Sequence, residues 1–583
     1  MADGEHYVGV DVGTGSARAC IIDANGDIKA TVSKDIQTWE PRSGYYEQST
    51  IDIWACISFC VKAALVQGAV DPTSVRGIGF CATCSLTVLS SKTDAPISVS
   101  GPKFDKPEQN VILWLDHRPV AEAETINATN DPVLKYVGGQ MSVEMEIPKI
   151  LWLKHNMPKE LWEDCKFYDL TDAITHIATG SEARSLCSTV CKQGYLPDGV
   201  EGIKQGWSDS FFDSIGLGEF KTDGYAKLGG INGQNGTFLS AGSKIGTLSP
   251  RAATDLGLPI GTAVGSGVID AYAGWIGTVG AKHNLLPPSG QGVIEAVGRL
   301  ALVAGTSTCH LTLSPDPHFV QGVWGPYRDV LPPGLWMTEG GQSATGKLLT
   351  HVLETHPAYP EVLILLKTDT THGNIYDFLN SHLVTLAQSS NSPDASIPHM
   401  CRHFDYYGDL FGNRSPLADP SMTGSIIGLT ADGRSIDSLA LHYYGVLEFL
   451  ALQTRHIIDA LSASGIPTTS LYMSGSQCQN ALLMRLMADV CAMPVWVPLY
   501  VNAAVVHGAA MLGAKAATET GEGGQSEDLW GIMERMSKPG SVVLPGGNTK
   551  EKGLFDVKYE IFLEQAEGQR RVRKKVEGAV KGW

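Results

Sequence analysis

Two short segments rich in Gly, Thr and Ser carry residue types that can hold phosphate groups. In the first, residues 11–18 (DVGTGSAR), an acidic residue ends an apolar stretch and a turn of small residues follows. The N–H groups and hydroxyls of such a turn can donate to phosphate oxygens, and Asp11 lies where a hydrated Mg²⁺ would bridge them. A plain hairpin turn explains this segment equally well. The candidate phosphate-binding residues are Gly13, Thr14, Gly15, Ser16 and Arg18.

A second turn of the same kind, residues 304–308 (AGTST), strengthens the phosphate interpretation. Two such hairpins facing each other could hold one triphosphate through Gly305, Thr306 and Ser307. Residues 341–347 (GQSATGK) also fit the GxxxxGK pattern of a P-loop. However, Leu348 stands where a P-loop needs Ser or Thr for Mg²⁺, so Lys347 is interpreted as a helix-surface lysine.

Asp270 lies between an apolar stretch and a helix of small residues in the segment VIDAYAG. A carboxylate at a helix N-terminus is favoured by the helix dipole, and it could accept a proton from a hydroxyl during phosphoryl transfer. The alternative is a simple N-cap aspartate. Residues 473–477 (MSGSQ) precede another helix, and this turn could bring the backbone close to an adenine, or be an ordinary capped loop.

The elements that must position these residues follow from periodicity and turn signals. The sequence predicts strands at 7–12, 17–23, 28–33, 299–304 and 309–313, and helices at 441–464, 481–492 and 502–517. Small residues in the last helix would permit close packing. The strand–turn–strand unit near the N-terminus recurs at mid-chain, which indicates two lobes divided near residues 280–292. Residues 389–398 are expected to form a loop, and the basic residues 569–575 a solvated helix end.

Composition excludes several classes of function. The 583 residues contain 44 Lys and Arg against 61 Asp and Glu, a net charge of −17, which disfavours nucleic-acid binding. The polar start lacks a signal-peptide pattern, and we expect no membrane span and a cytoplasmic location. Of the 12 cysteines, Cys81 and Cys84 form one CxxC without a second pair, so a zinc site is not favoured.

Taken in order, these segments resemble the FGGY carbohydrate kinases from residue 7 to residue 517. DVGTGSARA and AGTST resemble the family's two phosphate motifs, and ILWLDHR (112–118) its W-x-D-x-R substrate segment. GVIDAYAG resembles the segment with the catalytic aspartate, EGGQSATG (339–346) the E-x-G-Q-S segment of ribulokinases, and the stretch from Met473 the adenosine motif. TCSLT (83–87) resembles the TCSLV segment of the D-ribulokinase branch.

The resemblance implies an α/β fold of two actin- or hexokinase-like lobes around a cleft, each with a mixed five-stranded sheet. The sugar lobe would span 1–285 and the ATP lobe 286–583. The implied reaction is Mg²⁺- and ATP-dependent phosphorylation of the terminal hydroxyl of a ketopentose, D-ribulose, with Asp270 as general base. The implied sugar contacts are Ala82, Thr83, Cys84, Ser85, Asp116, Arg118, Lys192, Asp270 and Glu339. The implied adenosine contacts are Gly475, Ser476, Gln479 and Asn480.

Alternatives remain open from the residues alone. The substrate could be L-ribulose, D-xylulose, ribitol or glycerol. The same fold serves ATP-binding chaperones and filament proteins, or the chain could be a catalytically inactive relative. A homodimer is also left open. The sequence departs from the family pattern at Thr87 (Val expected), Asn413 (Glu expected in G-E-R-x-P), and Ser474 and Ser476 (paired glycines expected).

Overall fold

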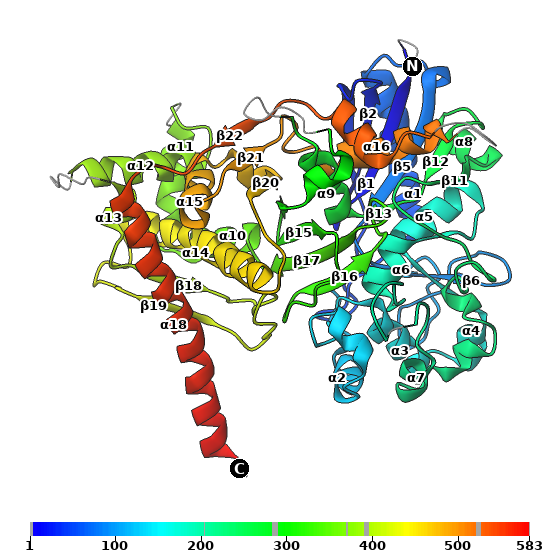
Figure 1. Cartoon of the computed structure of the whole chain (residues 1–583), viewed down its shortest axis with the longest axis horizontal. Coiled ribbons are helices and arrows are strands. Elements are labelled where there is room, and N and C mark those ends of the chain that lie inside the picture. The colour runs from blue at the N-terminus through cyan, green and yellow to red at the C-terminus, as the bar shows by residue number, and fades with distance from the viewer. Residues whose placement is uncertain are drawn as a thin grey trace.

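The computed structural model describes residues 4–202, 204–282, 290–368, 371–389, 396–519 and 526–581. These residues form two lobes, each built on a seven-stranded sheet with helices packed against it (Figure 1). In Figure 1 the blue and cyan elements make the first lobe, and most of the green, yellow and orange elements make the second.

The first lobe has the strand order β11-β12-β5-β1-β2-β3, with β13 pairing additionally with β5. β1 is buried along nearly its whole length and β2 along most of it, and Asn25-Gly26 turns β2 into β3 as predicted. The strands are β1 (His6–Val12), β2 (Ser16–Asp23), β3 (Ile28–Asp35), β5 (Val75–Ala82), β11 (Lys244–Thr247), β12 (Ala263–Gly265) and β13 (Val268–Ile269).

The second lobe has the order β16-β17-β15-β14-β20-β21-β22. Its strands are β14 (Arg299–Ala304), β15 (Thr308–Ser314), β16 (Trp324–Arg328), β17 (Trp336–Gln342), β20 (Ser470–Ser474), β21 (Val495–Val497) and β22 (Ser541–Val543). Smaller sheets join β4 (Glu47–Gln48), β7 (Val111–Ile112), β6 (Leu86–Ser90) and β8 (Cys165–Asp169), β9 (Arg184–Ser185) and β10 (Phe238–Leu239), and β18 (Asp405–Gly408) and β19 (Gly424–Ile427).

Both large sheets contain the same five-stranded core. In each, three antiparallel strands (β3-β2-β1, β17-β15-β14) are followed by two parallel ones (β5-β12, β20-β21). The expected number of five strands per sheet is therefore wrong, because two further strands extend each core: β11 and β13 in the first lobe, β16 and β22 in the second.

Helices cover the sheets and build the outer parts of both lobes. They are α1 (Thr50–Gln67), α2 (Val120–Ala128), α3 (Glu146–Asn156), α4 (Lys159–Asp164), α5 (Leu170–Thr179), α6 (Leu186–Lys192), α7 (Asp209–Ser214), α8 (Pro250–Leu256), α9 (Asp270–Val279), α10 (Gly346–Thr355), α11 (Tyr359–Thr368), α12 (Ile375–Ser389), α13 (Ile397–Met400), α14 (Ile436–Ala463), α15 (Ala481–Cys491), α16 (Ala504–Thr518), α17 (Leu529–Met536) and α18 (Thr549–Val580).

Helices α9 and α16 lie between the lobes and tie them together. Although α16 comes late in the chain, it packs on β1, β5 and β12 of the first lobe (Figure 1). A methyl group on Gly77 would lie 2.0 Å from the carbonyl oxygen of Gly513, and one on Gly508 would lie 2.0 Å from that of Ala273. The predicted close packing of small residues in this helix is thus confirmed.

Three local predictions need correction. Helix α14 begins at Ile436 rather than 441, because Ser435 caps it by accepting from the N–H of Ser438. The expected loop at 389–398 lies largely outside the described residues, and α13 occupies its end. Helix α1 has the length and mean hydropathy (1.4) of a membrane span, against the expectation that no such stretch occurs, but half of it is buried and it packs on β2 and β3.

The division between residues 285 and 286 falls in a segment outside the described residues, so it stays a prediction. The basic residues 569–575 lie in the last part of α18, a mostly exposed helix that projects from the second lobe (Figure 1).

Candidate active site

Three neighbouring strands of the first lobe end at one edge of the sheet, and each end carries a predicted site residue. Asp11 of β1 lies opposite Cys81 of β5, and Ile269 of β13 lies opposite Ala82. All three strands run parallel to one another, so Asp11, Ala82 and Asp270 converge at their carboxyl ends. This is the edge at which ligands bind in sheets of this kind.

Asp11 is almost fully buried without a cationic partner among the described residues. Its Oδ1 accepts a weak hydrogen bond from the Cys81 thiol at 3.7 Å. Burial raises the pKa of Asp11 to about 6, although the nearby Arg18 guanidinium opposes that rise. A buried, unpaired carboxylate of this kind suits a divalent cation, which would return it to its ionised form.

Asp270 is the first residue of α9, and its Oδ1 accepts from the N–H of Ala271 at 2.7 Å. Burial, and then the charge of Asp11, raise the pKa of Asp270 to about 7. A carboxylate with a pKa near neutrality can both hold and release a proton at working pH, as a general base requires.

Each of the two predicted phosphate turns is closed by a backbone hydrogen bond. The N–H of Gly13 donates to the carbonyl of Ser16 at 3.0 Å, and the N–H of Gly305 donates to that of Ser307 at 2.8 Å. Thr14 and Thr306, at the tips, are exposed. The indole of Trp114 donates to the Thr14 hydroxyl at 3.0 Å, which links the first turn to the W-x-D-x-R segment.

The segment after β5 is folded against the end of β1. The N–H of Thr83 donates to the carbonyl of Val12 at 2.9 Å, and the Thr83 and Ser85 hydroxyls are 3.2 Å apart. Ala82, Thr83, Cys84 and Ser85 are all buried. Burial raises the pKa of the free Cys84 thiol, an effect that Lys192 partly opposes. Lys192 therefore lies near this segment.

Lys192 and Glu339 meet across the lobes although 147 residues separate them. Lys192, the last residue of α6, donates to Glu339 Oε2 at 3.2 Å, and Tyr272 of α9 donates to the same oxygen at 3.0 Å. Burial acts to raise the pKa of Glu339, but Lys192 and Arg414 outweigh it and hold the pKa below its ordinary value.

Asp116 and Arg118, which the resemblance implies as sugar contacts, are engaged by other protein groups, and their contact with a sugar stays a prediction. Both side chains are fully buried, and they pair with each other at 2.8 and 2.9 Å. Arg118 also donates to Glu47 and to the carbonyl of Val99, while Asp116 accepts from the N–H of Tyr46. With their polar atoms satisfied in this way, they stabilise the segment that carries Trp114.

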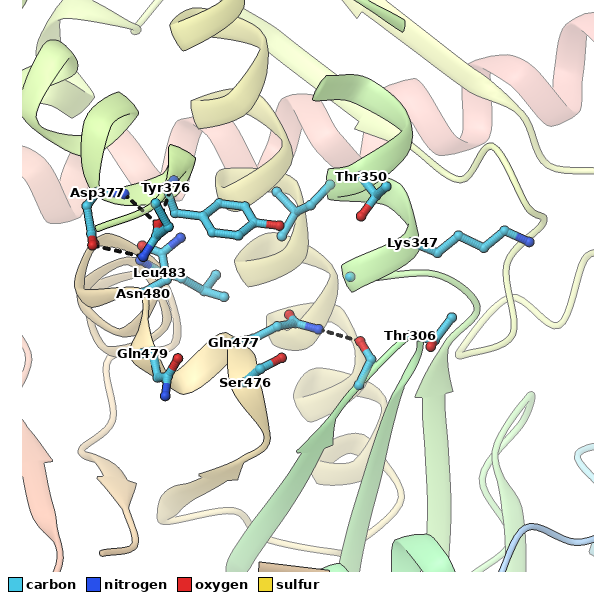
Figure 2. Close-up of a pocket in the computed structure, with 14 residues that line it drawn as sticks. Thr306, Lys347, Thr350, Tyr376, Asp377, Ser476, Gln477, Gln479, Asn480 and Leu483 are labelled. Atoms are coloured by element: carbon cyan, nitrogen blue, oxygen red, sulfur yellow. Dashed lines mark hydrogen bonds between the residues drawn. The ribbon is translucent and has the colours of Figure 1, made fainter. Parts of the chain in front are cut away.

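A cavity of about 670 Å³ opens beside the second turn (Figure 2). Five predicted nucleotide-binding residues line it: Gly305, Thr306, Ser476, Gln479 and Asn480. Gly475 and Ser307 are not among the lining residues, and Asn480 is held by its neighbours, because it caps α15 and donates to Tyr443 at 2.6 Å. The cavity has the size of a small-molecule site.

Gly475 packs against the end of β14, next to the Gly305 that lines this cavity. Its φ is +96°, and a methyl group on it would lie 1.9 Å from the carbonyl oxygen of Ala304, at the end of β14. Ser474, by contrast, is an ordinary buried residue of β20, so only the middle position of SGS demands glycine. The departures at Ser474 and Ser476 therefore leave the backbone of the turn intact.

Residues 341–347 do not form a P-loop. The N–H groups of Gly346 and Lys347 donate to the carbonyls of Gly305 and Thr306, so they are already engaged. Lys347 is an exposed residue of α10 that lies over the Phe411 ring, and in Figure 2 it points away from the other lining residues. The interpretation as a helix-surface lysine is confirmed.

Sequence reasoning missed two groups of residues. Asn374, Tyr376 and Asp377 line the cavity from the start of α12, a helix without a motif that could have been recognised. Arg414, which donates to Glu339 Oε1 at 2.7 Å, belongs to the recognisable G-E-R-x-P segment, and that motif could have identified it beside its neighbour Asn413. That neighbour, Asn413, is buried and donates to Asp409 at 2.8 Å.

Comparisons with known proteins show which family the chain resembles. Residues 6–277 match the N-terminal domain of the FGGY family of carbohydrate kinases, and residues 300–517 match its C-terminal domain. A D-ribulokinase of Saccharomyces cerevisiae is 49% identical over 528 residues, which cover 89% of this chain and 72% of that protein. A human FGGY carbohydrate kinase domain-containing protein is 41% identical over 571 residues, 97% of each chain.

Solved structures show the same fold. A xylulose kinase from Brucella ovis superposes with a TM-score of 0.73 at 18% identity, covering 97% of this chain and all of that one. A glycerol kinase from Plasmodium falciparum, solved with ADP, gives a TM-score of 0.71 at 15% identity over 96% and 98% of the two chains. The two-lobe fold is confirmed, and the chain belongs to the FGGY family of carbohydrate kinases.

Proposed function

We propose that this enzyme transfers the γ-phosphate of ATP to the terminal hydroxyl of D-ribulose, forming D-ribulose 5-phosphate. The observation that carries the proposal is the convergence of Asp11 and Asp270 at the ends of adjacent parallel strands. One carboxylate is suited to a metal and the other to a proton, which are the two groups that phosphoryl transfer to an alcohol requires.

In this proposal the nucleotide occupies the 670 Å³ cavity. Its phosphates extend beyond the lining residues and are held between the turns at Gly13–Ser16 and Gly305–Ser307. Mg²⁺, held by Asp11, would neutralise charge on the phosphates. The sugar lies at the strand ends beside Ala82–Ser85, Lys192 and Glu339. Asp270 takes the proton of the terminal hydroxyl as its oxygen attacks phosphorus. Asp116 and Arg118 support this arrangement indirectly.

The choice of D-ribulose rests on the yeast D-ribulokinase and on the TCSLT segment. The departure at Thr87 does not weaken it. Thr87 is a buried residue of β6, opposite Val111 and Tyr168, and its hydroxyl has no hydrogen-bond partner among the described residues. It therefore replaces the expected valine as a residue of the same shape, in a strand.

The test is ATP turnover by the purified protein with Mg²⁺ and D-ribulose, L-ribulose, D-xylulose, ribitol or glycerol in parallel. We expect the highest kcat/KM with D-ribulose, and a product whose ³¹P-coupled NMR spectrum places the phosphate on O5. A higher kcat/KM with another member of the panel would overturn the substrate assignment, while turnover with none of them would overturn the proposed activity.

A further inference from the structure

Arg414 lies between the lobes, next to Glu339, which side chains of both lobes contact. Its Nη2 donates to Glu339 Oε1 at 2.7 Å and lies 4.0 Å from Glu144 of the first lobe. Its guanidinium stacks over the Trp324 indole at 4.1 Å, the ring on which Lys192 also lies, at 4.3 Å. Neither cation is more than 11% exposed.

The backbone around Arg414 is fixed from several directions. Ser415 accepts from the N–H of Gly341 at 3.2 Å and donates to the carbonyl of Gly322 at 2.9 Å. The side chain of Arg414 lies flat on β17, because a methyl group on Gly341 would come within about 3.0 Å of its Cδ and Nε. Arg414 is therefore a rigid donor.

The two oxygens of Glu339 have different partners. Oε1 faces Arg414 of its own lobe, and Oε2 faces Lys192 and Tyr272 on the side of the first lobe. A planar guanidinium holds a carboxylate in a defined orientation, whereas an ammonium is a point charge on a flexible stem. The Arg414 contact lies within one lobe, whereas the two Oε2 contacts come from α6 and α9 on the side of the first lobe.

We propose that Arg414 is a positioning residue for sugar binding, which fixes Glu339 through Oε1 so that Oε2 can exchange Lys192 and Tyr272 for a sugar hydroxyl. This proposal rests on the proposed function, because it takes Glu339 as a sugar contact. It assigns a role to the arginine of the G-E-R-x-P segment and leaves Asn413 a structural one.

The first experiment compares Arg414→Met, Arg414→Lys and Glu339→Gln with the wild type. We expect Arg414→Met to raise the KM for the sugar by about 10- to 100-fold, the scale of a lost charge-assisted hydrogen bond, with the KM for ATP unchanged. Arg414→Lys should recover only part of the loss. Arg414→Met and Glu339→Gln should be non-additive in the double variant, because Arg414 acts through Glu339.

The pH dependence of sugar binding distinguishes a positioning role of Arg414 from a purely structural one. The titratable or charged groups around Glu339 are Lys192, Arg414, Tyr272, Tyr327, Cys309 and Asp270. In an Asp11→Asn, Asp270→Asn background, where neither of these carboxyl groups titrates, sugar affinity measured by calorimetry should be flat from pH 5 to 8. Adding Arg414→Met removes one of the cations that lower the pKa of Glu339, so affinity should then fall toward pH 5.

Arg328→Met is the matched control. Arg328 also stacks on a tryptophan, Trp336, and also contacts the first lobe, through the carbonyl of Asp198, but it does not touch Glu339. It should leave the sugar KM unchanged. An unchanged sugar KM in Arg414→Met, an equal rise in both KM values, or additivity with Glu339→Gln would overturn the inference. If the wild type prefers another sugar, the same set of single and double variants is measured with that sugar. Failure of the D-ribulose assignment is thus distinguished from failure of the role proposed for Arg414.

Discussion

Asp11 and Asp270 are two carboxyl groups whose negative charges disfavour each other. Each is buried, each has a raised pKa, and the charge of Asp11 is one cause of the shift at Asp270. Because each negative charge disfavours the other, a cation bound at Asp11 would favour the ionised form of both groups. We therefore expect metal binding at Asp11 and ionisation of Asp270 to be linked.

Replacing Asp270 by Asn tests the base directly. The variant should fold and bind ATP, but kcat should fall by about 10²- to 10⁴-fold, the usual contribution of a general base. Steady-state kinetics measure this loss. Asp172→Asn is the control: Asp172 is also buried, with a pKa raised to about 8 by burial, and it should keep near-normal kcat. Near-normal kcat in Asp270→Asn would remove Asp270 from the mechanism.

The raised pKa values also predict how stability depends on pH. A carboxyl group whose folded pKa lies above its unfolded value stabilises the fold below the unfolded pKa, and this contribution is lost as pH rises through the folded pKa. For Asp11 and Asp270 the loss runs from about pH 4 to about pH 7.

Mg²⁺ should therefore raise the Tm more at pH 8 than at pH 5, and Asp11→Asn should abolish the difference. Thermal unfolding at both pH values, with Ca²⁺ and high NaCl as ionic controls, measures this effect. An equal Mg²⁺ effect at both pH values would show that Asp11 does not hold the metal.

At the scale of elements, the sequence predicted the hairpins and helices that depend on interactions between residues close together in the chain. The hairpins β1–β2 and β14–β15 follow from apolar runs around Gly-containing turns, and α15 follows from apolar residues at helical spacing before Pro494. Contacts between segments that are far apart in the chain could not be predicted from the sequence. The residues around Asp116 and Arg118, for example, do not show that Glu47 and Val99 close around Arg118.

The turn before α15 offers a test at this scale. Gly475→Ala should raise the KM for ATP at least tenfold, because the new methyl group would overlap the carbonyl oxygen of Ala304 and push β20 away from the Gly305 turn. Gly216→Ala is the matched control, since Gly216 also has a positive φ (+80°) but open space around its Cα. Equal effects of the two variants on nucleotide binding would mean that strain, rather than the clash, matters.

At the scale of the whole molecule, the two lobes share structural elements. Helix α9 carries Asp270 from the first sheet and contacts β14 and β20 of the second, while α16 crosses it and packs on the first sheet. The sequence indicated a duplication, but it could not show that a helix near residue 510 completes the lobe that begins at residue 6. The lobes should consequently unfold together. Substitution of a small residue where α9 and α16 cross tests this expectation.

Gly508→Ala places a methyl group 2.0 Å from the carbonyl oxygen of Ala273, so it should force α9 and α16 apart. We expect a loss of about 3 kcal/mol in the free energy of unfolding, at the upper end for overpacking. Gly553→Ala, in the exposed part of α18 with nothing near its Cα, should instead stabilise by about 0.5–1 kcal/mol through helix propensity. Calorimetry should show one transition for the wild type and Gly553→Ala. If Gly508→Ala kept wild-type stability, α9 and α16 would not be the rigid link between the lobes, and Asp270 would have to be held in place by the first sheet alone.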